Sequence, residues 1–201
     1  MSEIFECLFG SKSRARIVRL FVLNGEKEYL VEDVVLKTLA PRRDTTKILG
    51  QLKKIKLVIE HTRKGKKMYT ANPQFELYPE LRTLFSKPSF GSDDQAFHKI
   101  RGVGDVRLIL VSGIFLNYPK SKADMILVAN TVSRAKLKTA VAALEAEVGQ
   151  EVRFVLMTLE EFQYRLNMTD RFLIEAVEQP HREVFNKLPE FKRFVAGVKK
   201  R

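Results

Sequence analysis

Lysine and arginine side chains are concentrated in one short stretch of the chain, where their spacing suits the binding of a polyanion. Residues 41–67 hold ten of these cations against two carboxylates, Asp44 and Glu60, so the stretch carries +8, from ten minus two. The whole chain carries +12. Guanidinium and ammonium groups bind phosphate oxygens, and arginine or glutamine can also form two hydrogen bonds to one base edge. This stretch therefore favours the recognition of nucleic acid.

Three helices are predicted before and within this stretch. Ser11 is typical of a helix N-cap and Asn24-Gly25 of a helix end, which predicts a first helix over 11–24. A second helix is expected over 31–40, because Pro41 must end it. The third helix starts after this proline and turns its polar residues outward. Its buried side is predicted to hold Thr45, Leu49, Leu52 and either Ile55 or the neighbours Ile48 and Leu57.

A β-hairpin is predicted directly after the third helix. Segments 57–63 and 66–72 have the composition of two short strands, and Lys64-Gly65 lies between them, where glycine can adopt a positive φ. Three helices followed by such a hairpin are typical of a winged helix-turn-helix. In that arrangement the third helix enters one groove of double-stranded DNA, and the hairpin contacts the neighbouring backbone.

This arrangement assigns the candidate contacts to DNA. The third helix is predicted to read sequence through Arg42, Arg43, Thr46, Lys47, Gln51 and Lys54. Contacts to the backbone are expected from Arg63, Lys64, Lys66 and Lys67 of the hairpin and from Arg14, with Lys12 and Arg16 beside it. Asp44 can either accept a hydrogen bond from cytosine or cap the third helix.

Composition and charge limit the class of protein and its location. The chain has 201 residues, 45% of them apolar, and no run of about 18 apolar residues that would cross a membrane. The start lacks the apolar core of a signal peptide, and the single cysteine, Cys7, cannot form an internal disulfide, so we expect a cytoplasmic protein. We expect Cys7 to be packed within the apolar segment 4–9.

The second half of the chain predicts a different kind of domain. Segments 106–116, 124–130 and 151–158 have the composition of strands, and segments 133–149, 159–167 and 170–178 have that of helices. Such alternation indicates an α/β domain, which makes the whole chain α+β. Residues 88–190 carry 13 basic and 14 acidic side chains, so this half is nearly neutral until a basic tail begins at residue 191.

Two segments resemble a known family. The opening LFGSKSRARIVRLFVLN and the later stretch LGQLKKIKLVIEHTRKGKKMYTANPQFELYPELRTL are similar to bacterial and archaeal winged helix-turn-helix transcriptional regulators fused to a nucleotidyltransferase-like domain. The resemblance covers residues 7–87 closely and extends more weakly to about residue 190. It implies a winged helix-turn-helix domain over 1–72 and a connecting helix or linker over 73–92. A nucleotidyltransferase-like domain with a mixed sheet and helices would follow over 93–190, and then the basic tail over 191–201.

Where this sequence departs from the family's pattern, the resemblance implies that the second domain is not catalytic. In nucleotidyltransferases a Gly-Ser pair follows the first strand, and two carboxylates in an Asp-x-Asp pattern hold Mg²⁺. Aligning Ser112-Gly113 with that pair places Asp124 at the first carboxylate and Ile126 at the second. Isoleucine cannot bind a hard cation, so we expect a degenerate domain with no catalytic residue, metal site or cofactor. The three histidines lie far apart without ligand partners at metal-binding spacing.

The function predicted from the sequence is a DNA-binding transcription regulator that is not an enzyme. Its expected partners are double-stranded DNA and a second copy of the chain, in a homodimer, with no membrane. The C-terminal domain would serve assembly or the sensing of a small-molecule effector. Alternatives are a non-specific architectural chromatin or RNA-binding protein, a nucleotidyltransferase, and an antitoxin-like partner of another protein. The tail is either a second DNA contact or a frayed end.

Overall fold

The structure is a computed structural model that describes residues 3–87 and 95–198. Over those residues the chain is a mixed α and β protein with a two-stranded and a four-stranded sheet. It divides into two compact units, Met1–Ser89 with Ala142–Glu151, and Phe90–Val141 with Val152–Arg201. None of the helices in the described parts of the chain is long and apolar enough to cross a membrane.

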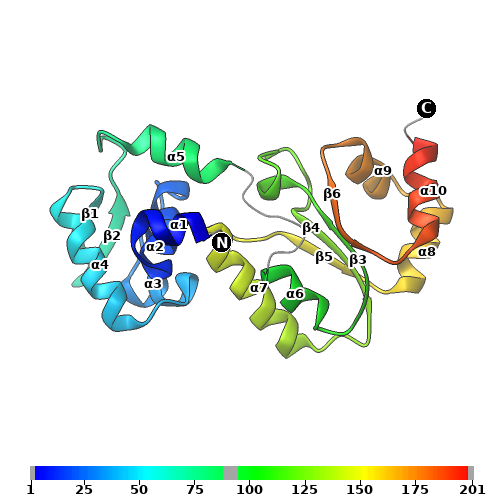
Figure 1. The fold of residues 1–201 in the computed structure, drawn as a ribbon, viewed down its shortest axis with the longest axis horizontal. Coiled ribbons are helices and arrows are strands. Elements are labelled where there is room, and N and C mark those ends of the chain that lie inside the picture. Colours follow the sequence, from blue (N-terminus) through cyan, green and yellow to red (C-terminus); the bar gives the residue numbers. More distant parts are fainter. Residues whose placement is uncertain (1–2, 88–94, 199–201) are drawn as a thin grey trace. The chain divides into compact units, whose positions relative to one another are not determined.

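The first unit is built from helices and one hairpin (Figure 1). Its elements are α1 (Glu3–Phe9), α2 (Lys12–Leu23), α3 (Val31–Thr38), α4 (Arg42–Lys54), β1 (Val58–Arg63), β2 (Lys66–Ala71) and α5 (Tyr78–Ser86). The predicted helices and strands between residues 11 and 72 are confirmed to within about two residues. Apolar side chains at helical spacing, including Phe21, Val34 and Leu49, meet in one core.

Hydrogen bonds cap the start of α2 and hold the start of α5 against the end of α2. The Ser11 hydroxyl accepts a hydrogen bond from the Arg14 amide at 3.2 Å, as predicted for an N-cap, and Asn24 is the C-cap. The hydroxyl of Tyr78, at the start of α5, donates to the Val22 carbonyl at 3.0 Å. The helix predicted within the segment 73–92 is thus α5, while residues 88–92 lie outside the described ranges.

The hairpin closes with a two-residue turn. Arg63 pairs with Lys66, and the intervening Lys64 and Gly65 have φ values of 50° and 73°. Two successive positive φ values match the right-handed twist of the strands. Glycine adopts this conformation without strain, whereas lysine does so at a cost. At the other end, the Asn72 side-chain amide donates to the Lys56 carbonyl at 2.8 Å and holds the hairpin to the end of α4.

The second unit contains a four-stranded mixed sheet in the order β5-β4-β3-β6. Its strands are β3 (Asp105–Val111), β4 (Met125–Asn130), β5 (Phe154–Met157) and β6 (Arg182–Asn186). Strand β4 runs parallel to β5 and antiparallel to β3, which is antiparallel to β6. The helices are α6 (Gln95–Arg101), α7 (Arg134–Val148), α8 (Leu159–Asn167), α9 (Arg171–Glu178) and α10 (Pro189–Val198), with the division between the units falling inside α7.

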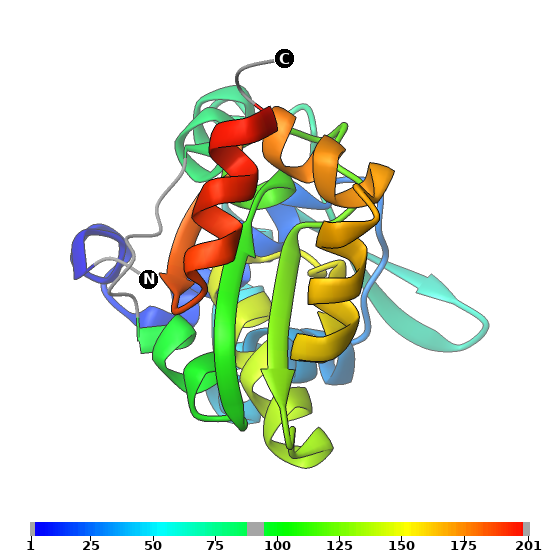
Figure 2. The ribbon, with the colours of Figure 1, turned by 90° about the vertical axis from the view of Figure 1, so that its right-hand side faces the viewer.

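Helices α8, α9 and α10 cover one face of this sheet (Figure 2). Leu108 and Leu110 point to that face and join a buried cluster with Phe162, Leu173 and Phe191. Alternate residues point to opposite faces of a strand, so these two leucines of β3 share the face that the helices cover. Strands β3 and β4 could be recognised in the sequence because both faces are buried, which makes each of them a short and nearly continuous apolar run.

Several expectations for individual segments are wrong. The strand predicted over 106–116 ends at Val111, because Gly113 has a φ of +54° and begins a short 3₁₀ turn, Gly113–Phe115. Cys7 is exposed on α1 rather than packed. The described part of the tail is not frayed, since α10 buries Phe191 against the Phe162 ring at 5.9 Å. Residues 199–201 lie outside the described ranges.

Candidate nucleic-acid interface

Helix α4 has a buried side and a fully exposed side, as its sequence predicts. Thr45, Ile48, Leu49 and Leu52 are buried, while the six predicted contact residues are all exposed. On the outer side, positions 43, 47, 50 and 54 follow one another at spacings of four, three and four, so they lie along one stripe of the helix. Arg43, Lys47 and Lys54 form this stripe around Gly50.

Gly50 is unusual in the interior of a helix. Glycine costs about 1 kcal/mol relative to alanine there, because it loses more backbone freedom on folding. A Cβ added at this position would meet no atom within 4 Å. The fold itself therefore has room for a side chain here.

Two other residues of the predicted set are held by neighbouring helices. Arg42 donates to the carboxylate of Glu32 in α3 at 2.7 Å. Arg14 of α2 donates to the Gln51 side-chain oxygen at 2.6 Å and to the Phe9 carbonyl at 3.4 Å. These exposed bonds connect the first and last turns of α4 to α3 and α2. Arg14 therefore positions Gln51, which leaves the amide nitrogen of Gln51 as its outward donor.

The hairpin cations are partly neutralised by two carboxylates. Arg63 donates to Glu28 at 2.7 Å, and His61 lies 3.1 Å from the same carboxylate. The hydrogen bond from Arg63 is the main cause that lowers the pKa of Glu28. Glu60 lies 3.2 Å from Lys53 of α4 and 3.6 Å from Lys67 of β2, so it ties the helix to the hairpin.

Five of the predicted contact cations have neither an ion pair nor a side-chain hydrogen bond within the described part of the chain: Arg43, Lys47, Lys54, Lys64 and Lys66. We call these five residues the cationic surface. They are exposed, and they lie on α4 and at the end of the hairpin that follows it (Figure 1). Cations without an internal partner offer their full charge to an external anion, whereas the charges of Arg42, Arg63 and Lys67 are partly neutralised by a carboxylate. Thr46 is also exposed, and its hydroxyl donates to the Arg42 carbonyl at 3.1 Å.

Lys12 and Arg16 do not join this surface. Both approach the carboxylate of Glu147, with Lys12 at 3.0 Å, and the Arg16 side chain is 13% exposed. Burial is the largest single influence and raises the pKa of Glu147, but the hydrogen bond and positive charge of Arg16, with the other positive charge nearby, together outweigh burial and hold the pKa at about 2. Arg16 is thus largely buried and held within the first unit, whereas the predicted contact with the DNA backbone requires an exposed guanidinium.

In the second unit, Asp124 is buried and its hydrogen-bonding capacity is used within the protein. One carboxylate oxygen accepts from the Ile114 amide at 3.1 Å and from Arg153 Nη2 at 2.9 Å. The other accepts from the Arg153 amide and Nε, both at 2.9 Å. Asp124 thus pins the turn after β3 to the start of β5. Ile126 is 4% exposed and packs in the core beneath α8–α10.

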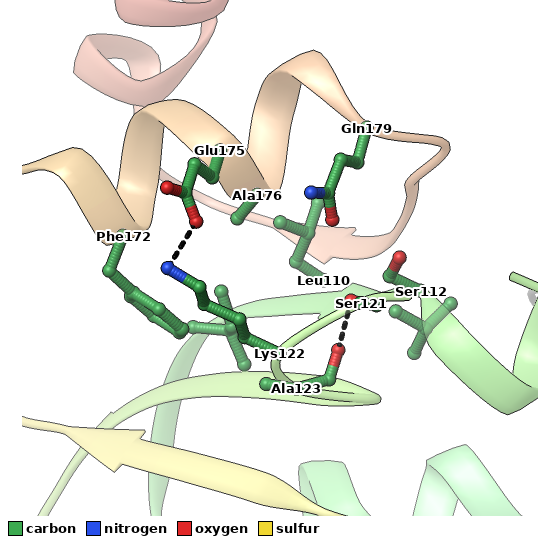
Figure 3. A pocket seen from close by; sticks show the side chains of 11 residues that line it. Leu110, Ser112, Ser121, Lys122, Ala123, Phe172, Glu175, Ala176 and Gln179 are labelled. Atoms are coloured by element: carbon green, nitrogen blue, oxygen red, sulfur yellow. Dashed lines mark hydrogen bonds and ion pairs between the residues drawn. The ribbon is translucent and has the colours of Figure 1, made fainter. Parts of the chain in front are cut away.

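The cavity beside this turn is small. It measures about 20 Å³, which is room for about one water molecule and not for a nucleotide. Lys122 and Glu175 form an ion pair of 2.5 Å across its rim (Figure 3). The Ser112 hydroxyl donates to the Pro180 carbonyl at 2.6 Å. Among residues 3–87 and 95–198, no group of three histidine, cysteine or acidic side chains could hold a metal ion.

Sequence reasoning missed the acidic partners that divide the cations into paired and unpaired ones. Glu28 and Arg63 lie 35 residues apart, and Glu147 and Arg16 lie 131 apart, so no local spacing could reveal these pairs. Glu32 and Arg42 are closer in sequence but sit on different helices. The exposed stripe of α4, by contrast, follows from helical periodicity alone.

Comparisons of the chain with protein-family models, curated proteins and solved structures give no match. The function must therefore be inferred from the geometry of the site.

Proposed function

We propose that the protein is a sequence-specific DNA-binding transcription regulator that works as a homodimer. In this proposal residues 1–72 form a winged helix-turn-helix, with α4 as the helix that reads base edges and the β1–β2 hairpin as the wing. Residues 93–190 are a degenerate nucleotidyltransferase-like domain, which serves assembly or ligand sensing and not catalysis.

The observation that carries the proposal is the cationic surface. Its five cations have no internal carboxylate partner within the described residues, and three of them share one stripe of α4 with open space outside it. A helix about 10–12 Å across with its side chains fits the major groove of DNA, which is about 12 Å wide. Lysines at the end of the hairpin are then available to the sugar–phosphate backbone.

The contacts of Asp124 support the non-catalytic part of the proposal. A metal-binding carboxylate must offer lone pairs to the ion, but those of Asp124 already accept hydrogen bonds from Ile114 and Arg153. A second carboxylate two residues later would be needed to hold Mg²⁺, and Ile126 occupies that position.

The test is affinity selection of the full-length protein from a random duplex DNA library, followed by binding of the selected duplex at several salt concentrations. The proposal predicts a consensus of two related half-sites, spaced for a dimer, with binding that weakens steeply as salt rises. No consensus, with salt-sensitive binding to every duplex or to RNA, would replace the proposal with an architectural or RNA-binding role.

A further inference from the structure

No feature within the described part of the protein explains why the residue in the middle of the α4 stripe is a glycine. Gly50 lies between Lys47 and Lys54 on the exposed side of a helix that continues through Lys54. Arg43 completes the stripe one turn before Lys47. Every other position of this stripe carries a long cationic side chain, so the helix surface is bare at one point only.

Three internal reasons for a glycine do not apply to Gly50. It does not end the helix, which runs to Lys54. It is not among the residues with a positive φ, unlike Gly65 and Gly113. No neighbouring atom approaches it, since an added Cβ would find nothing within 4 Å. Folding alone would therefore favour alanine at this position.

We propose that Gly50 is the point of closest approach between α4 and double-stranded DNA, where the bare helix backbone faces the floor of the major groove. This inference rests on the proposed function and adds the orientation of the helix to it. The groove is only about as wide as a helix with its side chains. A missing side chain on the inward-facing line lets the helix axis move closer to the base edges.

The flanking side chains fit this orientation. Arg43 and Lys47 precede Gly50 by seven and three residues, and Lys54 follows it by four, so all three lie on the same line. Their length allows them to reach base edges along the groove or to bend outward to phosphates. A side chain at position 50 would stand between them and hold the helix away from the bases.

The experiment compares Gly50→Ala and Gly50→Leu with the wild-type full-length chain on the duplex selected from the random library. A matched control is Gly197→Ala in α10, the same change at another exposed helical glycine with no atom within 4 Å of an added Cβ. We expect about tenfold weaker binding for Gly50→Ala, a greater loss for Gly50→Leu, and no change for Gly197→Ala. We also expect the Tm of Gly50→Ala to rise by about 3 °C.

A higher Tm together with weaker binding would show that the glycine at position 50 is required for DNA binding and not for folding. Wild-type affinity in Gly50→Ala would overturn the inference and leave the DNA-binding function intact. A lower Tm for this variant would also overturn it, because the glycine would then be required by the fold. Failure of the wild-type chain to bind any duplex would remove the proposed function and this inference together.

Discussion

The cationic surface of the first unit and the surroundings of Asp124 in the second differ in whether the charged groups have partners within the protein. On α4 and the hairpin, five cations are exposed without an internal carboxylate partner in the described part of the chain. Asp124, by contrast, is 0% exposed and accepts four hydrogen bonds, three of them from Arg153. A charged residue in a sequence motif is therefore available for binding or catalysis only if the fold gives it no internal partner.

Replacement of Asp124 should have the strongest effect, and this effect is on stability. Asp124→Ala removes a buried acceptor and leaves the Ile114 and Arg153 amides unsatisfied, so the free energy of unfolding should fall by about 3 kcal/mol. Urea unfolding of the full-length chain measures this. Asp105→Ala is the control, since its ion pair with Arg107 is exposed and contributes at most about 1 kcal/mol. Equal stability of the two variants would show that Asp124 is not structural.

The next largest effect should fall on the outer stripe of α4. Arg43→Ala and Lys47→Ala should each weaken binding of the selected duplex by about tenfold and weaken binding of random duplex less, because base contacts carry sequence discrimination. Fluorescence anisotropy with both duplexes measures the two losses. Lys138→Ala, an exposed lysine on α7, is the control and should leave both affinities unchanged. Equal losses on the two duplexes would argue against base readout by α4.

The hairpin cations should give a loss of a different kind. The double variant Lys64→Ala/Lys66→Ala should weaken all duplexes alike and should make the slope of log K against log salt about 1.8 less steep, from about 0.9 for each of two phosphates. Titrations over a range of salt concentrations measure this slope. A slope identical to that of the wild type would mean that the hairpin does not contact the backbone.

The smallest effect is a gain in affinity. Glu28→Gln removes the carboxylate that holds Arg63 at 2.7 Å, so this guanidinium becomes available to phosphate and binding should strengthen by about threefold at low salt. Glu26→Gln removes the same charge from an exposed neighbour that has no ion pair among the described residues. If both variants strengthen binding equally, the effect is one of net charge and not of Arg63.

Most helices and strands could be predicted from the sequence, but the sequence does not tell which charged side chains form ion pairs. Helices α2 to α4 and the hairpin could be placed because apolar side chains recur at helical spacing and Ser11, Pro41 and Gly65 mark the ends. Strand β6 was missed because its five residues are all half-buried and lack an alternating pattern. Helix α10 was missed because its cations masked Phe191, which is buried.

The paired and unpaired cations could not be separated from sequence because ion pairs form between elements brought together by folding. Arg63 and Lys66 are neighbours in the same hairpin and look equivalent in the sequence. Only the position of Glu28, brought beside β1 by the packing of the first unit, distinguishes them. The same reasoning applies to Arg16, whose partner Glu147 lies in a segment far along the chain.

The most direct test of the cationic surface is lysine footprinting of the full-length chain with an amine-acylating reagent, with and without the selected duplex. We expect DNA to protect Lys47, Lys54, Lys64 and Lys66, whereas Lys136 and Lys138 of α7 should react equally in both samples. Protection of the two α7 lysines, with unchanged reactivity on α4 and the hairpin, would contradict the assignment of DNA binding to this surface.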